Sequence, residues 1–380
     1  MGAVSSIESP SRSATGVART VALVGKRELA SMEFPLPEIG PGDLLVKVHL
    51  CGICGSDLHW WDGHWGPRYP TVLGHEFIGE VAEIGVEAAE RRGLAPGDPV
   101  AVEMLLPCWD CDRCREGRYN VCDQDDRSVD ESRGRQYGCN MPAQRPPTAL
   151  WGGYSEYLFA PREAIVHRLP DAVPWERAVF VEPLAVACRA VARGRVRPGE
   201  AAVVVGPGLV GIMLSIAAQA AGAEPVVVTG TRDYRLALAR EFGAAETINV
   251  REQDPEVELR RILDGSLADV SLEAAGTPVA QAQAARLVRR GGRAVLTGLC
   301  GPATLELDPD ADLLSKEIDL LGSFLSAGGY EPAIEIAAGG EWPLERLITH
   351  RLPLDEAARA FEIIERREQS VLKVVLDPWA

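Results

Sequence analysis

The sequence predicts an α/β protein with two domains, one rich in β-strands and one built on a doubly wound parallel sheet. The chain of 380 residues is long enough for two or three domains that each bury a core. Up to about residue 185, short apolar runs are broken by Gly and Pro, as in β-rich domains. From about 184 to 321, apolar strands alternate with Ala-rich helical segments, as in parallel α/β domains.

In the first part of the chain, four apolar runs have the length and flanking residues of β-strands. They cover residues 44–50, 77–84, 99–104 and 154–160. Between the last two runs, residues 108–149 are polar and contain several prolines. We expect this segment to form a lobe and a loop on the surface rather than part of the core.

The second part predicts a βαβ succession, followed by a tail. Its expected strands are 201–205, 226–229, 270–273, 293–297 and 318–322, and its clearest helices are 209–221 and 233–242. A helix from residue 355 and a strand at 371–376 should return to the first domain. We therefore expect a flexible leader at 1–18, a β-rich domain at 19–183 and 323–380, and a parallel-sheet domain at 184–322.

Charge and composition exclude several classes of partner. The chain has 55 acidic and 39 basic residues, a net charge of −16, which opposes binding to nucleic acid or to anionic membranes. The N-terminus has neither the basic region nor the apolar core of a signal peptide. We expect a cytoplasmic protein with a small-molecule substrate and with no nucleic-acid or membrane partner.

The cysteines are odd in number and clustered. Six of the nine lie between residues 51 and 122, which favours metal ligands in a reducing compartment over disulfides. Four thiolates at spacings of two, two and seven residues can enclose one tetrahedral zinc ion: Cys108, Cys111, Cys114 and Cys122. Because four sulfurs leave no position for a substrate, we interpret this lobe, at about 104–125, as a structural zinc site.

A second ligand set predicts a different kind of zinc site. Cys54, His75 and Glu76 supply one sulfur, one nitrogen and one oxygen, which leaves a fourth position for water or substrate. One thiolate and one carboxylate already neutralise Zn²⁺, and a further fixed anion would weaken it as a Lewis acid. We therefore expect Glu182 to lie next to the zinc-bound water, or to exchange with it as a ligand, rather than to be a permanent fourth ligand.

A glycine-rich turn predicts a dinucleotide site. Gly206, Gly208 and Gly211 form GxGxxG between an apolar strand and a helix that begins with Leu209 and Val210. The glycines permit a tight turn, close approach of the backbone to a pyrophosphate, and close packing of the helix, whose N-terminus faces the phosphates. This is the fingerprint of a Rossmann domain.

Together these motifs resemble the zinc-dependent medium-chain alcohol dehydrogenase superfamily, and they are most similar to its sorbitol, threonine and butanediol dehydrogenase group. Other matching segments are CGICGSDLH at 51–59, GHE at 74–76, GGYSEY at 152–157 and EPL at 182–184. They follow the family order over nearly the whole chain beyond the leader. The resemblance implies a GroES-like catalytic domain, a Rossmann domain, and assembly into a homodimer or homotetramer.

The resemblance also implies roles for individual residues. The three residues of the open zinc site match the catalytic metal ligands of the family. Ser56 and His59 match a proton relay, and Asp57 matches a carboxylate that orients the histidine ligand. A hydroxyl can pass a proton onward, and a near-neutral imidazole can exchange it with water, so the relay is chemically consistent.

Other notable side chains have simpler interpretations. An aromatic cluster directly after the relay, which would form either a substrate wall or ordinary packing, comprises Trp60, Trp61, His64 and Trp65. Three histidines are interpreted as structural, namely His49, His167 and His350. Four cysteines are interpreted as packed thiols, namely Cys51, Cys139, Cys188 and Cys300.

The end of the second parallel strand bears on the choice between NAD and NADP. About 20 residues past the glycine turn, an NAD enzyme presents Asp or Glu to the ribose 2′-hydroxyl. This chain has Gly230, Thr231 and Arg232 there, similar to NADP-linked secondary alcohol dehydrogenases. Arg232 and the hydroxyl can bind a 2′-phosphate, so we favour NADP over NAD. Asp233 keeps NAD as an alternative, although it is also placed to cap the next helix.

The sequence thus predicts an oxidoreductase with two zinc ions per chain, one catalytic and one structural. It would transfer a hydride between NADP(H) and a secondary alcohol, ketone or polyol, through a zinc-bound alkoxide whose proton leaves by Ser56, the nicotinamide ribose and His59. The alternatives are an NAD-dependent polyol, diol or threonine-type dehydrogenase, a zinc-free quinone or enoyl reductase, and a non-enzymatic zinc protein that senses dinucleotides.

Overall fold

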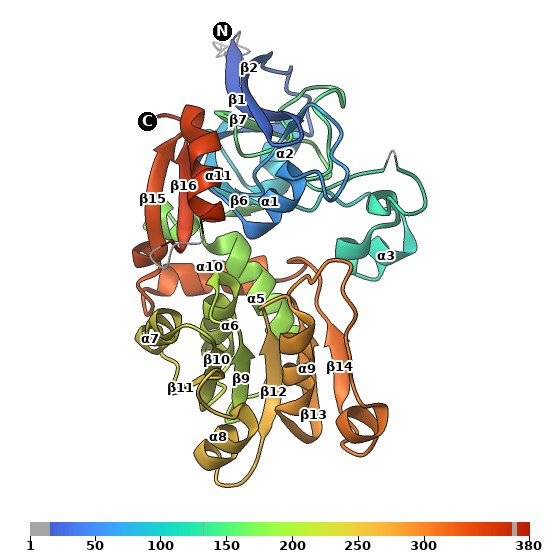
Figure 1. The fold of residues 1–380 in the computed structure, drawn as a ribbon. Coiled ribbons are helices and arrows are strands. Elements are labelled where there is room, and N and C mark those ends of the chain that lie inside the picture. Colours follow the sequence, from blue (N-terminus) through green and yellow to red (C-terminus); the bar gives the residue numbers. More distant parts are fainter. Residues whose placement is uncertain (1–15, 132, 367–370) are drawn as a thin grey trace, which may run out of the picture.

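The computed structural model describes residues 16–131, 133–366 and 371–380. Figure 1 shows an upper and a lower part, with the N- and C-terminal segments in the upper part and the middle of the chain in the lower part. A small three-stranded sheet flanks the upper part, formed by β2 (Glu28–Pro35), β1 (Val17–Gly25) and β4 (Thr71–Val72).

The upper sheet joins strands from both ends of the chain. Its order is β15-β16-β3-β5-β6-β8, and β7 also pairs with β3. β16 (Lys373–Asp377) runs antiparallel to β3 (Leu44–Gly52) and parallel to β15 (Ile348–Pro353). The other strands are β5 (Glu76–Ile84), β6 (Pro99–Val102), β7 (Tyr157–Ala160) and β8 (Val166–Arg168).

The lower sheet is parallel throughout, in the order β11-β10-β9-β12-β13-β14. Its strands are β9 (Ala202–Val205), β10 (Val226–Gly230), β11 (Glu246–Asn249), β12 (Ala268–Glu273), β13 (Val288–Leu296) and β14 (Asp319–Gly322). Every residue of β9 is buried, as expected when helices cover both faces of a sheet. The order reverses between β9 and β12, which is where such sheets bind ligands. This is the predicted doubly wound fold.

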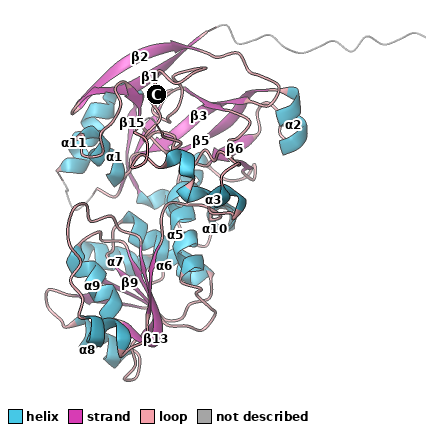
Figure 2. Cartoon of the chain, turned by 90° about the vertical axis from the view of Figure 1, so that its right-hand side faces the viewer, coloured by secondary structure: helices cyan, strands magenta, loops and turns pink. Residues whose placement is uncertain are grey.

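Helices cover the lower sheet and connect it to the upper one (Figure 2). Those of the lower part are α6 (Leu209–Ala220), α7 (Asp233–Glu241), α8 (Pro255–Ile262) and α9 (Pro278–Arg286). Two lie at the junction, α5 (Val181–Arg193) and α10 (Tyr330–Gly339). The upper part has α1 (Gly55–Trp61), α2 (Val86–Arg92), α3 (Asp112–Arg115), α4 (Trp175–Ala178) and α11 (Ala357–Glu365). Among the described residues, no helix is long and apolar enough to span a membrane.

One hydrophobic core runs through the junction. Leu50 and Ile78 of the upper sheet belong to the same buried cluster as Leu184 of α5 and Val204 of the lower sheet. The continuous packing fixes α5 against both sheets, because a close-packed core admits few alternative arrangements. A side chain at the start of α5 is therefore held in a defined position relative to both parts of the molecule.

Two expectations about the first part of the chain need correction. Residues 1–15 of the expected leader lie outside the described residues, but Val17 and Ala18 belong to β1, and Ala18 is fully buried. The segment 108–149 is not all surface, since Tyr137, Cys139 and Met141 are in the core of the upper part. This turn toward the core was not predicted, because the segment as a whole is polar. The Tyr137 hydroxyl stabilises the turn by donating to the carbonyl of Phe159 (3.1 Å).

Candidate active site

The three residues of the open zinc site lie together where β3 ends and β5 begins. The ligand atoms of Cys54, His75 and Glu76 are within 4.8 Å of one another. Strand register explains why, since Gly52 in β3 is paired with Glu76 in β5, and Cys54 follows β3 directly. One sulfur, one nitrogen and one carboxylate oxygen at this spacing fit Zn²⁺ with a fourth position left for another ligand.

Asp57 organises this group from within the core. Its Oδ2 accepts hydrogen bonds from the amide of Cys54 (2.9 Å) and the hydroxyl of Tyr154 (2.9 Å), and its Oδ1 lies 3.3 Å from Nδ1 of His75. The carboxylate is fully buried. Because Nδ1 of His75 faces Asp57, Nε2 is directed to the other side, where a metal ion would bind.

The Cys139 thiol lies behind the histidine ligand, where the sequence suggested only packing. Its sulfur is 3.6 Å from Nδ1 of His75, and both residues are buried. Burial lowers the pKa of His75, but Cys139 and Asp57 outweigh it and hold that pKa well above the usual value. Since a metal ligand must be neutral imidazole, zinc uptake here should release a proton.

A buried lysine completes the surroundings of Glu76. Lys373 in β16 is 1% exposed, its ammonium contacts the Glu76 carboxylate, and it donates to the carbonyl of Ile53 (3.2 Å). Burial lowers the pKa of Lys373, but Glu76 and its neighbours raise it above the usual value, so the lysine stays charged. No motif signals this residue, because a single lysine in a C-terminal strand would normally be exposed.

Glu182 lies close to this group but outside the ligand cluster of the described residues. It is in the first turn of α5 and is buried. Burial raises its pKa to about 7, and of the neighbours His75 lowers it while Glu76 raises it. A carboxyl group that titrates near neutral pH can either accept or donate a proton there.

The predicted relay residues are on one helix. Ser56 and His59 are three positions apart on α1 and therefore share a face. Ser56 Oγ is 3.3 Å from Nε2 of His75, and His59 is exposed with its Nδ1 3.4 Å from that of His64. Burial, and then His64, lower the pKa of His59. It is therefore neutral at pH 7 and can accept a proton.

The aromatic cluster after the relay divides into two parts. Trp60 and Trp61 are each 6% exposed, and Trp61 packs on Phe361 (ring centroids 5.0 Å apart), so both belong to the core. Ordinary packing is the correct interpretation for these two. Trp65 differs, because it stacks on the exposed His59 (4.8 Å) and is only half-buried.

The remaining histidines make local contacts. His49 stacks on Trp175 (4.3 Å), and His167 Nε2 lies 2.9 Å from Glu103 Oε1. His350 Nδ1 lies 3.1 Å from the hydroxyl of Thr349. None of the three belongs to a metal-ligand cluster of the described residues.

The four-cysteine lobe has the geometry of a closed metal site. The sulfurs of Cys108, Cys111, Cys114 and Cys122 are within 4.8 Å of one another. Two of the sulfur–sulfur distances are 3.9 and 4.0 Å, close to the separation of about 3.8 Å that Zn–S bonds of ~2.3 Å give in a tetrahedron. Backbone amides of Asp110 and Cys111 donate to the Cys108 sulfur, and despite burial they lower the pKa of this thiol to about 7. All four positions are thus filled by protein, and the donor set fits structural zinc.

The glycine turn has room where a pyrophosphate would bind. Gly206 has a φ of 101°, which favours glycine, and a Cβ on Gly211 would collide with the Gly206 carbonyl. A Cβ on Gly208, by contrast, would meet nothing within 4 Å. Leu209 and Val210 begin α6, whose N-terminus points toward this open space, as a dinucleotide site requires.

Gly230 has a packing role that the sequence did not reveal. A Cβ there would lie 2.5 Å from the ring of Pro207 in the glycine turn, so no acidic side chain fits at the end of β10. Thr231 and Arg232 follow at the surface. Asp233 does not cap α7: the cap is Arg232, and the Asp233 carboxylate accepts a hydrogen bond from Asn249 (2.7 Å) instead. This correction leaves Arg232 as the exposed charge nearest the end of β10.

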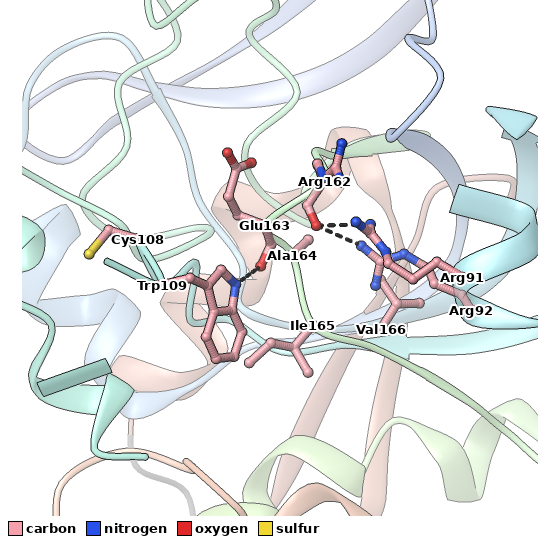
Figure 3. A pocket seen from close by; sticks show the side chains of 9 residues that line it. All are labelled: Arg91, Arg92, Cys108, Trp109, Arg162, Glu163, Ala164, Ile165 and Val166. Atoms are coloured by element: carbon pink, nitrogen blue, oxygen red, sulfur yellow. Dashed lines mark hydrogen bonds between the residues drawn. The ribbon is translucent and has the colours of Figure 1, made fainter. Parts of the chain in front are cut away.

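A surface hollow of about 530 Å³ lies beside the four-cysteine lobe rather than at the open zinc site (Figure 3). It is lined by Arg91, Arg92, Arg162, Trp109 and Cys108, among others. The guanidiniums of Arg91 and Arg92 both donate to the carbonyl of Arg162 (3.0 and 3.2 Å), and the Trp109 indole donates to that of Glu163 (2.9 Å). These hydrogen bonds stabilise the backbone at Arg162 and Glu163. None of the residues that line the hollow belongs to the open zinc site, so we assign it no catalytic role.

Comparisons with known proteins agree with this geometry. The family model "Alcohol dehydrogenase GroES-like domain" matches residues 40–171, and "Zinc-binding dehydrogenase" matches residues 210–339. A sorbitol dehydrogenase of Bacillus subtilis is 34% identical over 357 residues, which are 93% of this chain and 95% of that protein.

Two solved structures have the same fold over almost the whole chain. A zinc-binding dehydrogenase from Sinorhizobium meliloti, bound to NADP, gives a TM-score of 0.81 at 29% identity and covers 96% of this chain and 100% of its own. An alcohol dehydrogenase from E. coli CFT073, complexed with NADH, also gives a TM-score of 0.81 at 29% identity and covers 95% of this chain and 100% of its own.

Proposed function

Because the chain belongs to the zinc-dependent medium-chain alcohol dehydrogenases, we propose that it transfers a hydride between NADP(H) and a polyol or other secondary alcohol, or the corresponding ketone. The donor set of Cys54, His75 and Glu76 carries the proposal, since it offers three ligands and leaves one position open. A zinc-free reductase would not require these three ligands. The polyol class is suggested by the similarity to a sorbitol dehydrogenase.

We assign each residue around the site a different role in the reaction. Zinc held by these three residues would make a bound hydroxyl more acidic, and nicotinamide would accept the hydride. Asp57 and Lys373 hold the histidine and glutamate ligands in place from behind. Glu182, buried nearby with a pKa of about 7, is placed to accept a hydrogen bond from water or from a second substrate hydroxyl. A second zinc ion in the four-cysteine lobe would stabilise the fold.

Proton transfer to solvent would use Ser56 and His59. The Ser56 hydroxyl lies beside His75, and His59 is exposed one helical turn further along α1. A hydroxyl next to the reacting oxygen can pass on its proton, and an exposed neutral imidazole can release it to water. With a nicotinamide nucleotide bound, its ribose hydroxyls would supply further proton-transferring groups beside these two side chains.

Replacing His59 with Gln should slow alcohol oxidation at pH 7 by roughly tenfold. This is less than the ~100-fold of a positioned general base, because water reaches the exposed relay. The lowered pKa of His59 keeps wild type in the accepting form at pH 7, and the deficit should shrink as pH rises and hydroxide replaces the imidazole. The measurement is kcat/KM against pH for both proteins; superimposable profiles would remove His59 from the relay.

We propose NADP as the preferred dinucleotide. Pro207 leaves no room for an acid at position 230, and Arg232 is exposed directly after β10. The alternative is an NAD-dependent polyol dehydrogenase in which Asp233 turns from Asn249 to the ribose. A guanidinium bonded to a phosphate is a strong, charge-assisted contact, which favours the first.

Arg232→Ala should raise KM for NADPH by about tenfold or more, the equivalent of one charge-assisted hydrogen bond, and should leave KM for NADH within about twofold. Arg240→Ala is the matched control, because Arg240 is near the end of α7, the helix that Arg232 caps, and pairs with Glu246 (3.1 Å). It should change neither constant. An equal rise for both dinucleotides in the Arg232 variant would contradict a 2′-phosphate contact.

The wider organisation is also part of the proposal. We propose domain boundaries at 183/184 and 322/323, with the C-terminal segment completing the catalytic domain through β15 and β16. We further propose a homodimer or homotetramer in the cytoplasm, where all nine cysteines, none of which is in a disulfide, would stay reduced.

A further inference from the structure

The loop at residues 323–329 follows β14 at the edge of the parallel sheet where dinucleotides bind. β14 runs parallel to β13, and the amide of Ser323 donates to the carbonyl of Leu296 at the end of β13 (2.9 Å). The loop therefore leaves the sheet at its carboxyl edge, like the glycine turn after β9. Leu325 in this loop has a φ of 56°, which a non-glycine residue adopts only when its surroundings enforce it.

Side chains from outside the loop enforce this conformation. Asn120 Nδ2 donates to the carbonyl of Phe324 (3.0 Å), and Arg189 donates to that of Ala327 (2.7 Å). The amide of Gly328 donates to the hydroxyl of Tyr119 (2.9 Å). Three backbone groups of one short loop are thus bonded to three side chains that lie far from it in sequence.

These side chains also hold one another. Arg189 donates to Oδ1 of Asn120 (3.1 Å), so both ends of the buried Asn120 amide are used. The Tyr119 hydroxyl donates to the buried carboxylate of Glu103 (3.1 and 3.2 Å). Burial and Glu103 raise the pKa of Tyr119, so the hydroxyl keeps its proton. Nε of Arg189 is buried without a hydrogen-bond partner, but the remaining bonds of this buried network restrict the loop to few geometries.

The network connects the four-cysteine lobe to the reaction centre. Tyr119 and Asn120 form a turn of 3-10 helix between the third and fourth cysteines, and Figure 1 shows the lobe around α3 close to the end of β14. Arg189 is on α5, seven residues or two helical turns after Glu182. Tyr330 begins α10 just after the loop, and burial followed by Glu182 raises its pKa, so this end of the loop lies close to that carboxylate.

We propose that the four-cysteine lobe is the anchor of the 323–329 loop, and that Asn120, Tyr119 and Arg189 are positioning residues for dinucleotide binding. The inference rests on the proposed function, since it takes the carboxyl edge of the lower sheet as the dinucleotide site. It gives the lobe a second role besides stability. A metal held by the four cysteines would fix the 119–121 turn, and that turn holds the loop through Asn120 and Tyr119.

The test compares Asn120→Ala and Arg189→Met with Arg177→Met in the full-length zinc-loaded protein. Arg177 is the control, since it is also half-buried and donates to two carbonyls, those of Ala337 and Trp342 (both 2.9 Å), near the end of α10, in addition to its ion pair with Glu345 (2.9 Å). The readouts are the Kd for NADPH and for NADH from fluorescence titration, and Tm. We expect Kd to rise about tenfold in the first two variants, the equivalent of one or two hydrogen bonds, and to stay within about twofold in the control.

A lowered Tm with unchanged Kd in the Asn120 and Arg189 variants would overturn the inference, because the contacts would then only stabilise the fold. If wild type bound neither dinucleotide, the proposed function would fail, and this inference with it. Should Asn120→Ala not fold, Tyr119→Phe replaces it, since it removes one hydroxyl and keeps the ring. In that variant the Gly328 amide should exchange with solvent faster and Kd should rise; faster exchange with wild-type Kd would equally refute the anchor.

Discussion

His75→Ala should reduce turnover by about 10³-fold or more, because Lewis-acid stabilisation is worth several kcal/mol and this residue is one of the three ligands that we propose for the open site. Cys54→Ser should have the same effect. Each variant should retain one zinc per chain, in the four-cysteine lobe, instead of two. The measurements are kcat/KM with the best alcohol substrate and zinc content after gel filtration.

His350→Ala provides the control for a lost imidazole. The His350 imidazole lies 3.1 Å from the Thr349 hydroxyl and belongs to no metal-ligand cluster of the described residues, so its variant should keep both turnover and zinc. Near-normal activity in His75→Ala or in Cys54→Ser would refute the catalytic assignment. Loss of activity with both zinc ions still bound would show that the residue acts otherwise than as a ligand.

Cys111→Ser should lower Tm by at least about 10 °C, which corresponds to ~4 kcal/mol for a domain of this size. The reason is that a structural metal contributes its binding free energy to folding, and a hydroxyl is a poor replacement for a thiolate ligand. The measurement is thermal unfolding of the purified variant, together with zinc content.

Cys300→Ser is the matched control for Cys111→Ser. Cys300 is half-buried and makes one weak contact with Gln281 (3.6 Å). It belongs to neither of the two metal-ligand clusters of the described residues. Its Tm should stay close to that of wild type. If Cys111→Ser kept the wild-type Tm and both zinc ions, the lobe would not be a metal-stabilised structure.

Much of the site could be predicted because its chemistry is encoded locally. The resemblance of one short motif to the family indicated Cys54, Ser56 and His59, and the four lobe cysteines span 15 residues, so that their spacing indicated their grouping. The parallel sheet was predicted for a similar reason, since fully buried strands such as β9 are continuous apolar runs. β11 (Glu246–Asn249) was missed, because it is short and begins with polar residues.

Residues that reach the site from distant strands could not be predicted. Lys373 contacts Glu76 across 297 positions, and Cys139 approaches His75 across 64. Nothing in the local pattern of either residue differs from an exposed lysine or a packed thiol. Their positions depend on the pairing of β16 with β3 and on the inward turn after the lobe, which are properties of the tertiary structure.

At the end of β10, tertiary packing changes how two residues should be interpreted. Gly230 was taken as a missing acid, and its space is in fact filled by Pro207. Asp233 was considered as a helix cap and instead accepts from Asn249. Both findings weigh on the choice between NADP and NAD, because they describe which side chains remain available to a ribose or a 2′-phosphate.

The most direct test of the account is the rate of NADP⁺ reduction with a panel of polyols, vicinal diols and secondary alcohols, measured before and after zinc removal. We expect that at least one polyol or secondary alcohol supports reduction, that chelation abolishes it, and that added Zn²⁺ restores it. Reduction that persists at the full rate after both zinc ions have been removed would contradict the central claim.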